Sequence, residues 1–226
     1  MLCLISHCYA NNLVIDGSFE MGIDPVINLP NNYGYWGGDV TEIVGTSNGI
    51  TPLDGSSMLH FVYSYTTGPS PNYLRCDLWQ VIDVTSYASD IIAGNAIAEL
   101  SAFFNRVSVD SQTDTGFLVK IGAYSGPPDT FPSQREVSEL LLVENYIITD
   151  DQLSTWEELR VSMVLPVNTD FLAVEVCSDE NVFNDSTGIE FDGHYADVVS
   201  LTIIPEPSTL SLLSFGGLAL VRKRRR

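Results

Sequence analysis

Apolar residues between positions 11 and 204 recur in short runs and not at helical spacing. The runs are rich in β-branched and aromatic residues and are separated by glycine, proline, asparagine and aspartate, a pattern typical of strands and turns. We expect strands at residues 13–15, 58–65, 74–84, 98–104, 116–124, 140–148, 158–164, 171–177 and 196–204. Short helices are expected only at residues 86–92 and 150–154. This spacing predicts an all-β sandwich.

The chain of 226 residues has no internal repeat, and no long linker divides its body. We therefore expect residues 11–204 to form a single domain. Hydrophobic residues make up 45% of the chain and charged residues 17%. Disordered chains are poor in apolar residues, so this composition indicates a folded protein.

The C-terminal residues 205–226 follow a different pattern. An apolar run at residues 210–221 lies between Pro205, Glu206 and Pro207 and a basic cluster of Arg222, Lys223, Arg224, Arg225 and Arg226. A helix of that length would span about 18 Å, well short of a hydrocarbon core of roughly 30 Å. Such a short apolar helix suits a transient anchor whose arginines stay cytoplasmic.

The order of Pro-Glu-Pro, short apolar helix and arginine cluster resembles the PEP-CTERM sorting signal of Gram-negative bacteria. The resemblance covers residues 204–226. It implies an exosortase-type processing enzyme as a partner, transient anchoring in the inner membrane, and export to the cell surface or extracellular matrix. A plain tail anchor is the alternative, but it would give no reason for Pro-Glu-Pro directly before the helix.

Residues 1–10 are apolar and uncharged, and Cys8, Tyr9 and Ala10 loosely fit a secretory cleavage site. We interpret them as the end of a signal peptide that begins upstream. The alternatives are an unstructured N-terminus and a short first strand. A lipoprotein signal fits less well, because a bulky His7 precedes Cys8.

The chain has 29 acidic and 10 basic residues and a net charge of −19. Only five bases lie between residues 11 and 205, namely Arg75, Arg106, Lys120, Arg135 and Arg160. A body this acidic lacks the clustered bases that nucleic-acid binding requires. It would also be repelled by anionic membranes and anionic polymers.

Several segments in a fixed order resemble the galactose-binding-like jelly roll of many carbohydrate-binding modules. They are NLVIDGSFE at residues 12–20, Trp36-Gly37, PLDGSSML at residues 52–59, the strand around Gln80, Trp156 before the strand that ends at Leu165-Pro166, and YADVVSL at residues 195–201. The resemblance implies a jelly-roll β-sandwich. Another sandwich, such as an immunoglobulin-like one, is the alternative.

The same resemblance implies a structural calcium ion that joins the start of the chain to its last strand. The matching residues are Glu20 and Asp197. Calcium prefers several oxygen ligands, and it would relieve repulsion among the many carboxylates of this body. The alternative is that both residues are surface acids or that Asp197 caps a turn.

A sugar site requires aromatic faces for stacking and nearby polar groups for the sugar hydroxyls. Tyr33, Tyr35 and Trp36 lie in the loop NNYGYWGGD and form the best candidate patch for polysaccharide. Trp36 has an alternative role as a packed structural residue.

Two of the four cysteines, Cys76 and Cys177, lie in predicted strands. An oxidising compartment would permit a disulfide between them if their Cα atoms lie within about 7 Å. Two buried thiols are the alternative.

We find no nucleophile elbow, zinc-protease motif, phosphate loop or dinucleotide fingerprint. The sequence therefore favours a non-catalytic, carbohydrate-binding matrix protein. A passive matrix component without a specific ligand and a glycan hydrolase remain the alternatives.

Overall fold

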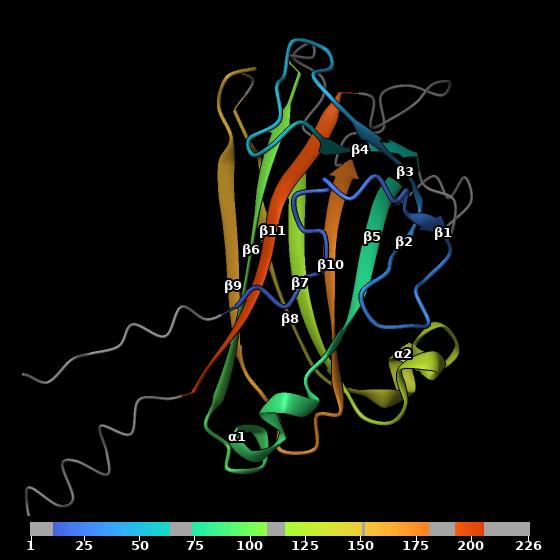
Figure 1. Cartoon of the computed structure of the whole chain (residues 1–226), viewed down its shortest axis with the longest axis vertical. Coiled ribbons are helices and arrows are strands. Elements are labelled where there is room, and N and C mark those ends of the chain that lie inside the picture. Colours follow the sequence, from blue (N-terminus) through green and yellow to red (C-terminus); the bar gives the residue numbers. More distant parts are fainter. Residues whose placement is uncertain (1–10, 64–73, 108–115, 151, 181–192, 206–226) are drawn as a thin grey trace, which may run out of the picture.

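The computed structural model of the chain is a sandwich of two sheets (Figure 1). It describes residues 11–63, 74–107, 116–150, 152–180 and 193–205. One sheet, called sheet A, has the order β1-β2-β5-β10-β7-β8, and the other, sheet B, has the order β3-β4-β11-β6-β9. All neighbouring strands are antiparallel except β1 and β2.

The first sheet is built from β1 (Val26–Ile27), β2 (Trp36–Gly38), β5 (Leu74–Asp83), β7 (Gly116–Tyr124), β8 (Glu139–Ile147) and β10 (Phe171–Glu180). The second is built from β3 (Val40–Val44), β4 (Met58–Tyr63), β6 (Ala96–Arg106), β9 (Glu157–Val164) and β11 (His194–Pro205). The described helices are η1 (Thr85–Tyr87), α1 (Ala88–Ile92), η2 (Pro128–Thr130) and α2 (Phe131–Ser138).

Strands β4 to β11 follow the connectivity of a jelly roll. In sheet B these strands lie in the order β4-β11-β6-β9, and in sheet A in the order β5-β10-β7-β8. The chain crosses to the other sheet at each connection except the one between β7 and β8. This arrangement confirms the predicted all-β jelly-roll sandwich.

Alternation along the strands creates the core between the sheets. On β6 the even-numbered residues from Ala96 to Phe104 are buried, and on β10 Leu172, Val174 and Val176 face them. The central strand β7 is buried along its whole length, because its outer face is also covered. Strand β7 therefore reads as an almost continuous apolar run, interrupted only by Lys120.

Helix α2 covers part of the outer face of sheet A. Its Phe131 packs against Trp79, Tyr124 and Phe171, with ring centroids 5.2–6.3 Å apart. The guanidinium of Arg135 lies 5.2 Å from the Trp79 ring centroid. In Figure 1 this helix lies beside the sandwich, whereas α1 lies at one end.

Two of the predicted elements are wrong. Residues 13–15 form no strand, because their backbone groups bond largely to single side chains and isolated carbonyls instead of a continuous ladder. The described part of residues 150–154 is a turn, closed by Thr155 N donating to Gln152 O at 2.9 Å. The helix expected at residues 86–92 is confirmed as η1 and α1.

Five elements were missed by the sequence pattern, namely β1, β2, β3, η2 and α2. Strands β1 to β3 are short, and β2 contains two consecutive glycines, so their periodicity is weak. Helix α2 begins with a proline in its first turn, a start signal that the sequence does contain.

The predicted disulfide is wrong, because Cys76 and Cys177 are free thiols. Their strands are neighbours, but the register pairs Cys76 with Ser178 and Cys177 with Asp77. Consecutive residues of a strand point to opposite faces. Cys76 therefore faces the core, while Cys177 faces the outer side of sheet A.

Residues 1–10 and 206–226 lie outside the described residues, and so do the predicted signal-peptide end, Glu206, Pro207, the apolar run at 210–221 and the basic cluster. Within the described part of the chain, no helix is long and apolar enough to cross a bilayer.

The two thiols give a direct chemical test. We expect alkylation in denaturant without reductant to label both Cys76 and Cys177, as read by peptide mass spectrometry. The folded protein should label neither, because both side chains are fully buried. Labelling of these two peptides only after reduction would contradict the register between β5 and β10.

Candidate ligand-binding site

The N-terminal segment is attached to the edge of the sandwich by two amide side chains. The Asn12 Oδ1 accepts from the Val14 and Leu201 amides at 3.0 and 2.9 Å, and its Nδ2 donates to Val199 O at 3.0 Å. The fully buried Gln80 bonds both backbone groups of Ile15, accepting from its N–H and donating to its carbonyl, each at 2.8 Å. These bonds fix the segment on which the pocket is built.

A close approach between two loops completes this edge. Gly34 has a φ of +76°, and a Cβ at this position would lie 2.9 Å from the Ile15 side chain. Its amide donates to Val81 O at 2.9 Å. The glycine thus lets the loop of Tyr33 and Tyr35 lie directly against Ile15.

The two loops enclose a pocket of about 250 Å³ that is mostly apolar. It is lined by Ile15, Asp16, Met21, Ile23, Asp24, Val26, Tyr33, Gly34, Tyr35 and Trp36. Its apolar side chains are unusually exposed, since Ile15, Met21, Ile23, Val26 and Tyr35 each show at least half of their surface. Exposed apolar clusters with polar rims are typical of binding sites.

The structure brings the three predicted aromatic residues together in this pocket, in different roles. Tyr35 is 58% exposed and presents its ring to solvent. Tyr33 is half-buried, and the pKa of its hydroxyl is raised. Desolvation is the main cause, and the negative charges of Asp83 and Asp170 add to it.

Trp36 has the packed role that the sequence left open. It is 6% exposed, its indole N–H donates to Asp16 O at 3.2 Å, and its ring lies 5.6 Å from that of Phe19. It therefore supports the pocket from the core side.

The pattern of the sequence missed the aliphatic wall of the pocket, because Met21 and Ile23 lie in an irregular segment and Val26 lies in the two-residue strand β1, too short to show periodicity. The two carboxylates at the pocket were missed as well. The Asp16 Oδ1 accepts from Met21 N at 3.0 Å, which holds this carboxylate in place.

Glu20 and Asp197 both bind the loop at residues 53–57. Glu20 accepts from the Ser56 and Ser57 amides at 2.8 and 2.6 Å and from the Ser56 hydroxyl at 2.9 Å, and these bonds lower its pKa. Asp197 accepts from the Leu53 and Asp54 amides at 2.8 and 3.1 Å. The predicted pair therefore contacts one loop, Asp197 at residues 53 and 54 and Glu20 at residues 56 and 57.

Asp197 is fully buried, and desolvation raises its pKa to about 6 although three backbone amides, including that of Val198, bond its carboxylate. It lies at a bulge where β11 shifts register against β6. The bulge turns this side chain toward the loop instead of along the regular pleat.

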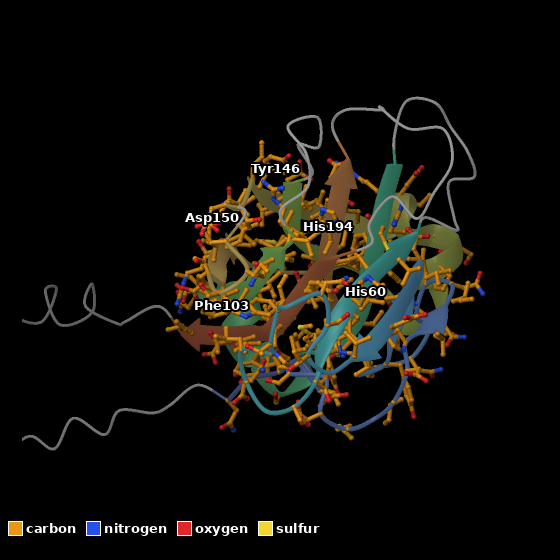
Figure 2. All side chains as sticks on the ribbon, turned by 90° about the horizontal axis from the view of Figure 1, so that it is seen from above. His60, Phe103, Tyr146, Asp150 and His194 are labelled. Carbon is orange, nitrogen blue, oxygen red and sulfur yellow. The ribbon has the colours of Figure 1, made fainter. Side chains whose placement is uncertain are left out.

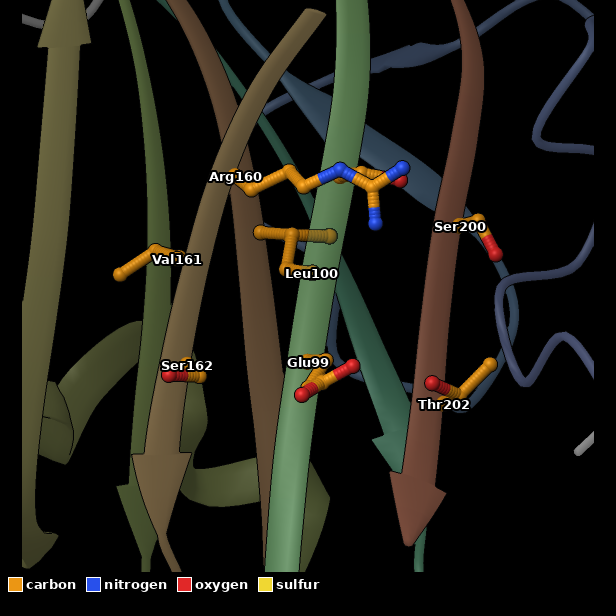
Figure 3. Close-up of a pocket in the computed structure, with 8 residues that line it drawn as sticks. Glu99, Leu100, Arg160, Val161, Ser162, Ser200 and Thr202 are labelled. Atoms are coloured by element: carbon orange, nitrogen blue, oxygen red, sulfur yellow. The ribbon is translucent and has the colours of Figure 1, made fainter.

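A second, larger pocket of about 490 Å³ lies on the outer face of sheet B (Figure 3). Its polar lining consists of Glu99, Ser101, Arg160, Ser162, Ser200 and Thr202. Figure 3 shows these side chains on β6, β9 and β11. No aromatic residue lines this groove among the described residues, so it offers hydroxyl and charge contacts but no stacking surface.

The two described histidines lie away from both pockets. His60 accepts from Gly193 N at 3.3 Å and stacks on Tyr195, while His194 packs 5.8 Å from the Phe117 ring. Figure 2 shows both among the packed side chains, with Tyr146 and Asp150 at the margin. His194 faces the core between the sheets. His60 lies on the outer side of sheet B, 3.7 Å from Glu42 Oε2, because its neighbours Leu59 and Phe61 face the core.

The outer face of sheet A carries a buried polar cluster that the sequence analysis did not identify. Asp77 lies opposite Cys177, and Glu175 lies opposite both Trp79 and Lys120. Burial, with the charge of Asp77, raises the pKa of Glu175 and of the Cys177 thiol well above their ordinary values. Strand alternation puts Asp77 and Trp79 on one face, but only the β5–β10 pairing brings Glu175 to them.

Comparison with known proteins identifies the C-terminal segment. Residues 204–226 match the PEP-CTERM protein-sorting motif. The match confirms the sorting signal inferred from Pro-Glu-Pro and the arginine cluster, and it indicates an exported protein. The chain matches no curated protein sequence.

Among solved structures, the chain is similar to TmCBM61, determined in complex with beta-1,4-galactotriose (11% identity, 87% of this chain, 100% of that chain, TM-score 0.48). It is also similar to a family 16 carbohydrate binding module (13% identity, 84% of this chain, 99% of that chain, TM-score 0.46). A third is the enzymatically active domain of bacteriophage CBA120 tailspike protein 4 (13% identity, 85% of this chain, 21% of that chain, TM-score 0.45). At these identities the likeness concerns the fold alone.

The raised pKa of Asp197 predicts the sign of a pH effect in calcium-free buffer. A carboxyl whose folded pKa of about 6 exceeds its ordinary value of 3.8 stabilises the fold at low pH and loses that contribution as the pH rises through 6. The unfolding free energy of the wild type, relative to Asp197→Asn, should therefore fall between pH 4 and 7, by an amount on the order of 2 kcal/mol.

Thermal and urea unfolding at several pH values, with EDTA present, measure this difference. Glu99→Gln, which removes an exposed acid in the sheet B groove, is the control and should give a flat relative profile. A wild type that gains stability over Asp197→Asn as the pH rises would show that the folded state favours the ionised carboxylate.

Proposed function

We propose that this exported protein is processed by an exosortase-type enzyme and binds a neutral polysaccharide, without catalysis, at the cell surface or in the extracellular matrix of a Gram-negative bacterium. Before processing, residues 205–226 would hold it transiently in the inner membrane. The observation that carries the binding proposal is the pocket between residues 15 and 36, where an exposed tyrosine ring, aliphatic side chains and two carboxylates lie together.

The chemistry of this pocket fits a pyranose. The exposed face of Tyr35 can stack on the C–H surface of a sugar, and Ile15 and Val26 extend that apolar surface. Asp16 and Asp24 line the same pocket and accept hydrogen bonds from sugar hydroxyls. Few protein ligands other than sugars combine apolar faces with so many hydroxyl donors.

The charge of the body supports a neutral ligand. Each of its five bases has a partner within the protein. Arg75, Lys120 and Arg160 form ion pairs with Asp179, Glu175 and Glu158. Arg106 donates to Thr149 O, and Arg135 lies over the Trp79 ring. An anionic polymer would meet many carboxylates and no unpaired basic patch on the described surface.

We also propose that calcium binds where Glu20 and Asp197 meet the loop at residues 53–57. Carboxylate oxygens are ligands that calcium prefers. The Glu20 Oε2 accepts one hydrogen bond, from the Ser56 hydroxyl, and the Asp197 Oδ1 accepts one, from the Val198 amide, so each of these two oxygens keeps a lone pair for the ion. In this role the ion would brace the loop against the start of the chain. The hydrogen bonds already described would then position the ligands.

The pocket predicts a selective loss of sugar binding. On a glycan array and in affinity electrophoresis with neutral polysaccharides, Tyr35→Ala should lose most binding, because stacking contributes about 1–3 kcal/mol in comparable aromatic contacts. Tyr146→Ala, at another partly exposed tyrosine on β8, is the matched control and should bind as the wild type does.

Silence of the wild type on every neutral glycan would remove the binding proposal and favour a passive matrix component. Release of new reducing ends from a bound glycan would instead favour the hydrolase alternative. Equal losses in Tyr35→Ala and Tyr146→Ala would place the binding site elsewhere.

Calcium should raise the melting temperature by several degrees over EDTA at saturating concentration, because it binds only the folded state. Glu20→Gln should abolish this difference, whereas Glu99→Gln should retain it. The same melting temperature with calcium and with EDTA, for the wild type, would remove the calcium proposal.

A further inference from the structure

A ladder of polar side chains crosses the outer face of sheet A. The register pairs Arg75 with Asp179, Asp77 with Cys177, and Trp79 with Glu175 on β5 and β10. Because alternate residues share a face, Asp77, Cys177 and Glu175 all project to the same side. This cluster lies on the sheet away from both pockets described above.

The three side chains are close enough to share one ion. One ligand atom from each, two carboxylate oxygens and the thiol sulfur, lie within 4.8 Å of one another. Glu175 and Cys177 are fully buried, and Asp77 is half-buried and connects the cluster to solvent. Among the described residues, no other group of three such side chains comes this close.

An unsatisfied polar group points into the cluster. Lys120 Nζ lies 2.9 Å from the Glu175 Oε2, but the fully buried Oε1 has no hydrogen-bond partner. The buried Oδ1 of Asp77 has none either. Buried carboxylate oxygens without donors are costly, and a bound cation would satisfy both.

We propose that Asp77, Glu175 and Cys177 bind one transition-metal dication of the zinc type. A thiolate ligand disfavours calcium and magnesium, which prefer oxygen, and two carboxylates with one thiolate suit zinc or cobalt. Binding forms one metal–sulfur bond and two metal–oxygen bonds, and the thiol proton and the proton shared by the two carboxyl groups leave to solvent. The ammonium of Lys120 balances the remaining negative charge.

A fourth ligand position is left to water, which reaches the site on the side of the half-buried Asp77. Lys120 also lies 5.7 Å from the Trp79 ring centroid, so its position is held from two sides. The neighbouring pair of Arg75 and Asp179, with 3.1 Å between Nη2 and Oδ2, closes the end of the ladder.

Cobalt titration of the full chain tests this site. The substitutions Cys3→Ser and Cys8→Ser leave Cys76 and Cys177 as the only thiols. Cobalt should then produce a thiolate-to-metal charge-transfer band in the near ultraviolet, saturating at one ion per chain. Zinc should abolish the band, and calcium in excess should leave it unchanged, which separates this site from that of Glu20 and Asp197.

Matched variants identify the ligands. In this background Cys177→Ala should lose the band, and Cys76→Ala, which removes the thiol on the opposite face of the same sheet, should keep it. Asp77→Asn should weaken cobalt affinity roughly tenfold or more. Circular dichroism melts verify that each variant is folded.

The proposal would be overturned if the charge-transfer band persists in folded Cys177→Ala. It would also be overturned if the parent protein with Cys3→Ser and Cys8→Ser shows no band. The cluster would then be an acid pair that shares a proton beside a neutral thiol. Neither result bears on sugar binding at the pocket of Tyr35, which the glycan array tests separately.

Discussion

The attachment of the N-terminal segment by Asn12 and Gln80 is the constraint on which the proposed binding surface depends. Gln80 is buried in sheet A, and its side-chain amide bonds both backbone groups of Ile15, which holds the segment against the sandwich. That position lets the Asp16 carbonyl accept a hydrogen bond from the Trp36 indole N–H, and it brings Glu20 to the loop at residues 53–57. The pocket and the position of Glu20 therefore both depend on the attachment of the N-terminal segment.

The bases of the sandwich are few, and each has a partner within the protein. Arg75, Arg106 and Lys120 contact acids or a carbonyl, Arg135 lies over an aromatic ring, and the exposed Arg160 pairs with Glu158. The outer face of sheet A shows the cost of burying acids, since Lys120 pairs with one oxygen of Glu175 while Glu175 Oε1 and Asp77 Oδ1 have no donor. A net negative charge repels anionic polymers, in keeping with the neutral ligand and the cations proposed above.

The sequence predicts most of this fold because strand periodicity is strong where strands are long. The range predicted for β7, residues 116–124, matches its observed bounds, and β4 to β6 and β8 to β11 lie near their predicted ranges. The sorting signal was readable because its three parts are contiguous. Tyr33 and Tyr35 were readable because aromatic residues stand out in a loop of glycine and asparagine.

What escaped prediction depends on contacts between distant strands. The local sequence pattern does not reveal that β5 pairs with β10. This pairing places Cys76 and Cys177 on opposite faces of sheet A, and it brings Asp77 close to Glu175. The aliphatic wall of the pocket was not predicted for the same reason, since Met21 and Val26 line a pocket only when their segment folds against Tyr35.

The most direct test of the central claim is methyl-detected NMR of the protein titrated with a neutral oligosaccharide that it binds. The account predicts that shift changes concentrate on the methyl groups of Ile15, Met21, Ile23 and Val26, which line the pocket. Unchanged signals there, with shifts instead at Leu100, Val161 and Thr202 of the groove on sheet B, would contradict it.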